Sequence, residues 1–130
     1  MAQTSASNAC TLVFQISDTV VTSSGNLNVL FMGTATSSPG FKSGLGVRCV
    51  SGTLKRIYLG NNPPGTGAKA FPNGDSPAQS TNAWVASQSP AAGVTRHYYD
   101  AYRNSGGPVN CNTVNDRFNL TNAGSITWVP

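Results

Sequence analysis

The stretch FNLTNAGSITWVP, residues Phe118–Pro130, decides the fold class. Ile126 and Trp128 alternate with other residues here, and alternate residues of a β-strand point to the same face. Both side chains are therefore expected in a core, on a strand docked in a sheet. Pro130 cannot donate to a sheet ladder, so we expect the last strand, and the domain, to finish there.

Similar apolar runs recur along the chain between Gly, Pro, Asn and Ser, at the spacing typical of strands. The further predicted strands are CTLVFQI (10–16), NLNVLFMG (26–33), LGVRCV (45–50), TLKRIYLG (53–60), NAWVAS (82–87) and VTRHYYDAYR (94–103). Ser51 and Gly52 resemble a two-residue hairpin turn that would bring TLKRIYLG back beside LGVRCV. The pattern predicts an all-β antiparallel β-sandwich of about seven or eight strands, with a closed β-barrel as the alternative.

Two stretches are predicted as long loops. NNPPGTGAKAFPNGDSP (61–77) is rich in proline and glycine and cannot supply a central strand. NSGGPVNCNTVND (104–116) precedes the closing strands. Long loops in small domains often carry function, so the first of them is the first place to look for a binding surface.

Length and composition predict one domain over residues 1–130, with residues 1–9 as a mobile N-terminal segment. Only 9% of the residues are charged, against about 25% in typical domains, and glutamate is absent. Long helices are therefore not expected. The formal charge of +4 is spread thinly rather than clustered, which argues against nucleic acid as a partner.

No apolar run approaches the roughly 18 residues of a membrane-spanning helix, and residues 1–10 show no signal-peptide pattern. Membrane insertion is therefore not expected. The low charge and abundant Ser, Thr and Asn favour a secreted or cell-surface protein whose signal or upstream region is absent from this chain.

The cysteines are Cys10, Cys49 and Cys111, without a CxxC motif, and His97 is the one histidine. A zinc site therefore lacks ligands. Alternation in LGVRCV directs Cys49 to the core. We predict a Cys49–Cys111 disulfide with Cys10 left over; the alternative is three buried free thiols.

Asp75 is a weak calcium candidate that an Asn-Gly turn explains equally well, so we expect no metal and no cofactor.

The chain has few side chains of the kinds that catalyse reactions. In RHYYD, Arg96, Tyr98 and Asp100 share one strand face, while His97 lies on the other, so strand geometry disfavours a His97/Asp100 dyad. No GxSxG motif occurs. We expect no enzyme; a remote alternative is an enzyme of unfamiliar type that uses His97, Asp100 and Arg103.

Aromatic and amide side chains are the remaining candidates for ligand binding. In β-sandwich modules, aromatic rings stack against sugar rings and amides form hydrogen bonds with sugar hydroxyls. The candidate ligand-binding residues are Trp84, Tyr99, Tyr102, Asn73, Asp75 and Arg103. Tyr99 and Tyr102 fall on opposite strand faces, so at least one of them is expected to be exposed. A core role for these aromatic residues is the alternative.

The elements GLGVRCVSGTLKRIYLG, TRHYYDAYR, a loop cysteine and FNLTNAGSITWVP resemble the C-terminal domain of an uncharacterised family of large, predicted exported bacterial proteins of planctomycete and myxobacterial type. The match covers roughly residues 44–130. It implies an extracellular all-β module at the end of a longer protein and supports the Cys49–Cys111 pairing. Asp100 and Ala101 stand where the family pattern has Gln and Trp, so a surface role of that strand does not carry over.

These observations predict a non-catalytic secreted accessory module that binds polysaccharide or a cell-surface glycan near residues 61–77. The alternative is a structural, self-assembling, sorting or adhesion module that associates with a protein partner or with copies of the same chain. In that case the strand predicted over Cys10–Ile16 could add to the sheet edge of a neighbour.

Overall fold

The computed structural model describes residues 2–5, 14–17, 26–44, 46–71, 90–103 and 118–129. Regular structure in these ranges consists of strands alone. They are β1 (Ala2–Ser5), β2 (Phe14–Ile16), β3 (Leu27–Ser43), β4 (Gly46–Asn61), β5 (Lys69–Phe71), β6 (Thr95–Arg103), β7 (Phe118–Leu120) and β8 (Gly124–Val129).

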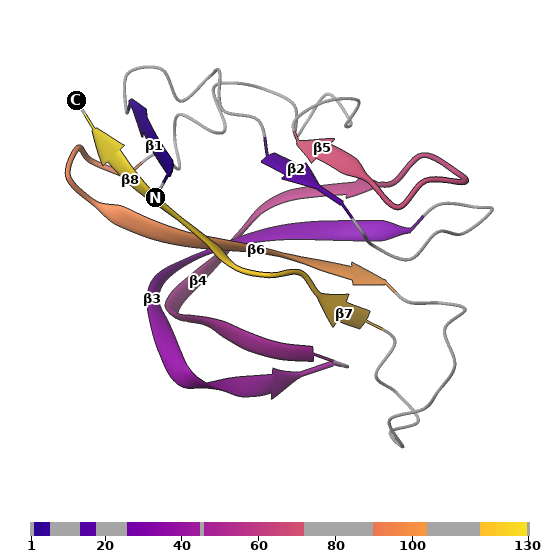
Figure 1. The fold of residues 1–130 in the computed structure, drawn as a ribbon, viewed down its shortest axis with the longest axis horizontal. Coiled ribbons are helices and arrows are strands. Elements are labelled where there is room, and N and C mark those ends of the chain that lie inside the picture. The colour runs from indigo at the N-terminus through magenta and orange to yellow at the C-terminus, as the bar shows by residue number, and fades with distance from the viewer. Residues whose placement is uncertain are drawn as a thin grey trace.

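The strands form two sheets, which confirms the predicted all-β sandwich. The larger sheet has the order β1-β8-β6-β3-β4, with β7 beside β6, and β2 pairs with β5 in the smaller sheet. The smaller sheet lies over one face of the larger one (Figure 1). Among the described strands the larger sheet ends at β1 and β4, so it is open rather than closed on itself. Its pairings are antiparallel except for β1 with β8, which are parallel.

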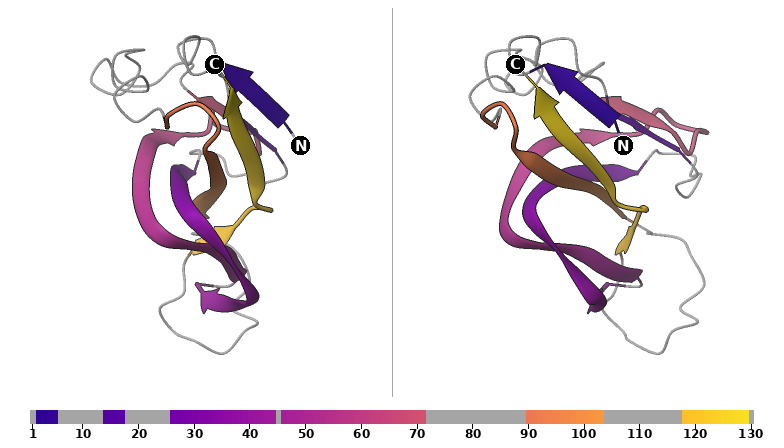
Figure 2. Two further views of the ribbon diagram at one scale, coloured as in Figure 1. Left: turned by 90° about the vertical axis from the view of Figure 1, so that its left-hand side faces the viewer. Right: turned by 60° about the vertical axis from the view of Figure 1, so that its left-hand side comes forward.

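β3 and β4 form one long hairpin that bends strongly, so that its far half leaves the core (Figure 2). The register of the pair shifts between Leu30 and Phe31, between Gly33 and Ala35, and between Thr36 and Phe41. Extra residues of this kind bend and twist a strand pair. At the central shift the two strands approach closely, because a Cβ added to Gly33 would lie 2.3 Å from Cγ1 of Val50.

The predicted turn at Ser51 and Gly52 is wrong. Both halves of the expected hairpin belong to β4, and both pair with β3. Gly52 and Thr53 together oppose Thr34, and Gly52 has a φ of +74°. The positive φ therefore serves a β-bulge instead of a turn. The Thr53 N–H donates to Oγ1 of Thr34 at 2.9 Å, which fixes the bulge.

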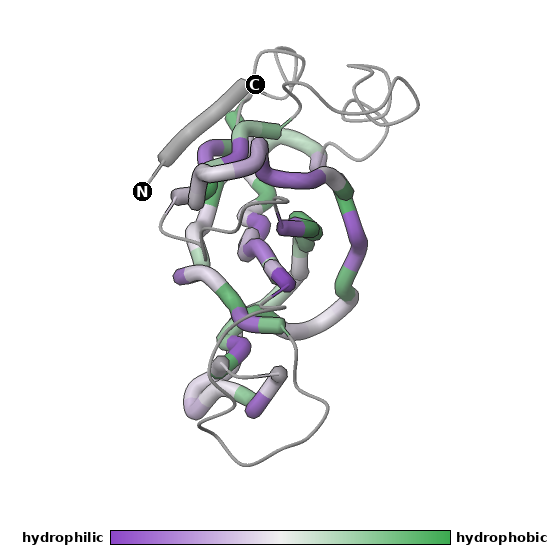
Figure 3. The backbone as a smooth tube through the Cα atoms, turned by 90° about the vertical axis from the view of Figure 1, so that its right-hand side faces the viewer, coloured by the Kyte–Doolittle hydropathy of each residue, from purple (hydrophilic) through white to green (hydrophobic). Residues whose placement is uncertain are grey.

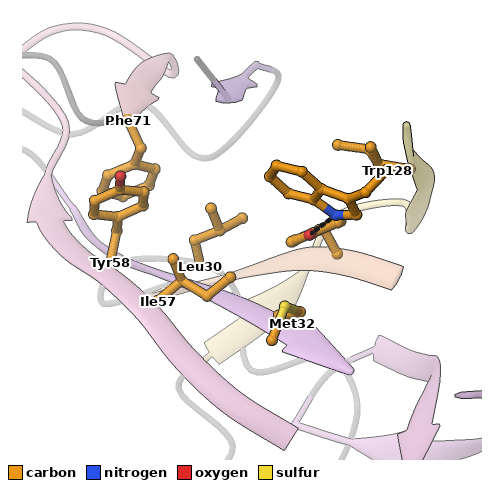
Figure 4. Close-up of a cluster of buried hydrophobic side chains, with 8 residues drawn as sticks. Leu30, Met32, Ile57, Tyr58, Phe71 and Trp128 are labelled. Carbon is orange, nitrogen blue, oxygen red and sulfur yellow. Dashed lines mark hydrogen bonds between the residues drawn. The ribbon is translucent and has the colours of Figure 1, made fainter. Parts of the chain in front are cut away.

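The core lies between the two sheets and contains residues from both. Trp128 is 2% exposed, and its Nε1–H donates to the Tyr98 hydroxyl at 3.1 Å. The rings of Tyr58 and Phe71 stack at a centroid distance of 5.5 Å. In Figure 4 this stack and Trp128 lie at opposite ends of the cluster, with Leu30 between them. The remaining buried members are Met32, Ile57 and Ile126. The predicted core positions of Ile126 and Trp128 are thus confirmed.

Hydrophobic and hydrophilic residues alternate along the strands (Figure 3), as expected for sheets with differently covered faces. The predicted strand over residues 94–103 is confirmed as β6, and the two closing strands as β7 and β8. Lys69–Phe71 forms β5 inside the stretch predicted as a loop. This strand avoids the prolines and pairs only with the three-residue β2, so the local turn signals did not exclude it.

Some predictions fall wholly or partly outside the described residues. They include the strand around Trp84, the loop over residues 104–116 and the first part of the strand over residues 10–16. Ala2–Ser5 pair with β8, although residues 1–9 were predicted as a mobile segment. The single-domain assignment stays a prediction.

The close approach at Gly33 generates a stability prediction. Gly33→Ala should lower the free energy of unfolding by about 1–3 kcal/mol, because the new Cβ meets Val50 and the Ser51 carbonyl. Gly124→Ala is the matched control, since a Cβ there meets nothing within 4 Å. Urea unfolding of both variants measures the difference. Equal stability of the two variants would show that the close approach is not required.

Candidate functional site

Three cavities flank β2, and Gln15 and Ile16 line all of them. Their volumes are about 620, 370 and 330 Å³. We call them the first, second and third β2 cavities, in order of size. They lie where the small sheet meets the large one, so residues from distant parts of the sequence share their walls.

The wall of the first cavity carries several polar residues. Asn61 and Asn62 line it together with Gln15 and Ser17. Asn62 is 2% exposed, and its Oδ1 accepts a hydrogen bond from Nδ2 of the fully buried Asn28. The Asn62 backbone N–H also donates to the Asn26 carbonyl at 2.8 Å. These bonds hold the wall in place.

The small sheet also contributes a cation to the first cavity. Lys69, on β5, lines the cavity and is 8% exposed. Its Nζ lies 5.3 Å from the ring centroid of Phe71, within the range of a cation–π contact.

A buried carboxyl group distinguishes the third cavity. Asp100 is 0% exposed and lines this cavity, and neither carboxyl oxygen has a hydrogen-bond partner among the described residues. Its backbone is well satisfied, because its N–H donates to Oγ1 of Thr121 and its carbonyl accepts from the Thr121 N–H, each at 2.9 Å. Burial raises the pKa of the Asp100 carboxyl from 3.8 to about 7.

Aromatic rings form one side of the third cavity. Phe14 of β2 lies against Tyr98 of β6, with ring centroids 4.9 Å apart at 44°. Burial raises the pKa of Tyr98, so its hydroxyl stays neutral and accepts the bond from Trp128. Ser125, Thr121 and the backbone around them complete the polar side. The cavity thus combines an aromatic wall, hydroxyl groups and one carboxyl group.

The expectation that Tyr99 or Tyr102 is exposed is wrong. Tyr99 is 6% exposed and stacks on Phe31 at 5.2 Å and 11°, with the Arg48 side chain hydrogen-bonded to it. Burial raises its pKa. Tyr102 is 8% exposed and lines the second cavity. Phe31 of β3 and Arg48 of β4 therefore cover Tyr99.

One of the remaining predicted ligand-binding residues, Arg103, belongs to the described part of the chain. Arg103 is exposed at the end of β6. Trp84, Asn73 and Asp75 lie outside the described residues. His97 lies on the opposite face of β6 from Asp100, and its Nδ1 is 2.7 Å from Oγ of Ser125. The geometry agrees with the expectation that strand alternation separates the two.

Cys49 corrects two predictions. It is an exposed free thiol, not a core residue, and the structure does not contain the predicted disulfide to Cys111. The inward side chain of this segment is Val50, at 0% exposure, whereas Val47 is 62% exposed. Val50 occupies the space that Gly33 leaves open, so the alternation runs in the opposite phase from the one predicted. Cys10 and Cys111 lie outside the described residues.

Sequence reasoning missed β2 as the centre of the site. Gln15, Ser17 and Asn122 carry no local signal, because the cavities arise only where β2 lies over the large sheet. Asp100 did carry a signal. The alternation of side chains along the strand places this acidic residue on the same face as Tyr98.

No protein-family model matches the chain, and neither a curated protein nor a solved structure matches it. The bacterial family resemblance stays a prediction. The described ranges contain no group of three or more His, Cys, Asp or Glu residues able to hold a metal ion. They also contain no helix with the length and apolar character needed to cross a membrane.

The buried carboxyl group predicts an unusual pH dependence. The folded-state pKa of about 7 lies above 3.8, so the folded protein retains the proton longer than the unfolded chain. The Asp100 contribution therefore lowers the free energy of unfolding as pH rises from about 4 to about 7. Asp100→Asn should remove this trend and stabilise the fold at neutral pH by roughly 4 kcal/mol.

Urea unfolding of the wild type and of Asp100→Asn, in steps from acid to mildly alkaline pH, measures this difference. A constant difference in unfolding free energy across that range would contradict the assigned ionisation.

The exposed thiol predicts ready alkylation. Native protein treated with iodoacetamide, without reductant or denaturant, should carry the label at Cys49, because the thiol is solvent-accessible and unbonded. Peptide mapping by mass spectrometry identifies the labelled site. If Cys49 resists the label until reductant is added, it is in a disulfide, and the predicted pairing with Cys111 regains support.

Proposed function

We propose that this protein is a non-catalytic secreted or cell-surface module that binds polysaccharide in the β2 cavities. The observation that carries the proposal is the composition of their walls. Residues with amide or hydroxyl groups line the three cavities, and aromatic residues line the second and third; the polar residues are Gln15, Ser17, Asn61, Asn62 and Thr121.

The chemistry of these walls suits sugars. Sugar hydroxyls donate and accept hydrogen bonds, and side-chain amides and hydroxyls do both. The faces of sugar rings are apolar and lie well against aromatic side chains such as Phe14. The cavity volumes, from about 330 to 620 Å³, fall within the usual range of small-molecule sites. A segment of one or a few sugar rings fits this size.

The position of the cavities also supports the proposal. Residues 61–77 were predicted as the first place to look for a binding surface, and their described part supplies much of the wall of the first cavity. Tyr102 contributes to the second cavity. Tyr99 lines the third cavity, and its ring stacks on Phe31 of β3. The low charge of the chain and the bacterial family resemblance support the extracellular location.

A structural or assembly role is the second candidate. β4 is a 16-residue strand at the edge of the large sheet, and Phe41 and Val47 near the hairpin end are 51% and 62% exposed. Open edges of this length invite pairing with another chain. Lys55 and Arg56 are exposed on the same strand, and charged side chains discourage such pairing. Polysaccharide binding is therefore favoured.

A pull-down against soluble and insoluble polysaccharides tests the proposal. Retention on at least one glycan is expected, and Gln15→Ala should weaken it about five- to tenfold, because Gln15 lines all three cavities. Thr36→Ala is the control, since Thr36 is exposed on β3 and lines none of these cavities.

Failure to bind any glycan, together with concentration-dependent light scattering, would favour the assembly role instead. Retention that Gln15→Ala leaves intact would place the binding surface elsewhere on the molecule.

A further inference from the structure

The third β2 cavity holds a carboxyl group without a counter-charge. Both oxygens of Asp100 lack a hydrogen-bond partner among the described residues, although the side chain is completely buried. Burial alone accounts for its raised pKa, with no contribution from a neighbouring charge. Burying an unpaired carboxylate lowers the free energy of unfolding. Pairing the group with a cation, or keeping it protonated, reduces this cost.

The surrounding elements do not supply that cation. Besides Asp100, the titratable side chains that line the third cavity are Tyr98 and Tyr99, and neither is a cation. Arg96 donates from Nη1 to the Thr95 carbonyl at 3.0 Å, and Lys69 lies over the Phe71 ring. The residue opposite Asp100 on β3 is Leu30, and β2 contributes no charged residue.

The walls around Asp100 favour a cationic group on a sugar-sized ligand. Aromatic ring faces attract ammonium groups, and Phe14 and Tyr98 stand at this cavity. An ammonium group has three donors and a positive charge, which satisfies both unpartnered oxygens. A neutral hydroxyl has one donor and leaves the charge uncompensated.

We propose that the third cavity recognises the ammonium group of an amino sugar, through an ion pair with the Asp100 carboxylate. This proposal rests on the proposed function, since it names the class of saccharide that the same site selects. Because Asp100 is fully covered, the ligand reaches it when Phe14 and the rest of β2 move aside. β2 is suited to such a movement, because it has three residues and, among the described strands, pairs with the equally short β5 alone.

Calorimetric titration with three β-1,4-linked oligosaccharides of equal length tests the ion pair. The probes are oligomers of glucose, of N-acetylglucosamine and of glucosamine, which differ in the group at one ring carbon. Wild-type protein should bind the glucosamine oligomer at least about tenfold more tightly than either neutral oligomer. Asp100→Asn should lose this preference and bind the three oligomers about equally, while Thr36→Ala should keep it.

A second measurement does not depend on the variant folding. The carboxyl carbon resonance of Asp100 reports its titration in the wild-type protein. Saturating glucosamine oligomer should lower the pKa of this carboxyl, because the ammonium stabilises the ionised form, whereas the glucose oligomer should not.

The outcomes separate the two proposals. Equal binding of all three oligomers, or an Asp100 titration unmoved by the glucosamine oligomer, overturns the ion pair and leaves polysaccharide binding intact. Absence of binding by every oligomer overturns the ion pair, and the pull-down against the wider panel of glycans then decides whether polysaccharide binding stands.

Discussion

The antiparallel pairing of β3 with β6 is the constraint on which the rest of the structure depends. It runs from Asn28 opposite Tyr102 to Gly33 opposite His97. Because strand faces alternate, this register places Asp100 opposite Leu30 on the inner face and Tyr99 opposite Phe31 on the outer face. A shift of one residue would exchange the two sets and send the carboxyl group to the outer face. The core and the candidate site therefore depend on the same alignment.

The buried polar side chains of the inner face differ in how well they are hydrogen-bonded. Asn28 and Asn62 are buried together and bond to each other and to the backbone of the Asn26 region. Asp100, on the same face, has no such partner among the described residues. The free-energy cost of burying this carboxyl group is offset by the apolar cluster around Trp128, which keeps the sheets together. The least satisfied group of the inner face thus lies beside a cavity, where a ligand could supply what the protein does not.

Local alternation predicted the parts of the fold in which strands run regularly. It identified β6 and β8, and it placed Trp128 in the core before any neighbour was known. It failed where one extra residue changes the phase. The bulge at Gly52 was interpreted as a turn, and the inward position was assigned to Cys49 instead of Val50. A positive φ at glycine serves turns and bulges alike, so the sequence around Gly52 could not distinguish them.

The site was less predictable than the fold, for a physical reason. Recognition was assigned to aromatic residues, yet Tyr99 is covered by Phe31, and that contact depends on the β3–β6 register. The cavities depend on where the three-residue β2 lies, which no local pattern encodes. The residues singled out from the sequence that line the third cavity are two neighbours on β6, Tyr99 and Asp100.

The parallel pairing of β1 with β8 has a consequence for the order in which the chain folds. It joins Ala2–Ser5 to residues 126–129, across nearly the whole length of the 130-residue chain. The β3–β4 hairpin, by contrast, connects neighbours in sequence and can form while later residues are still being synthesised. The indole of Trp128 reaches the core only after the final strand has left the ribosome. Until then the inner face of β3 and β6 lacks the part of its cover that Trp128 supplies. Partly folded chains with exposed apolar surface are prone to association.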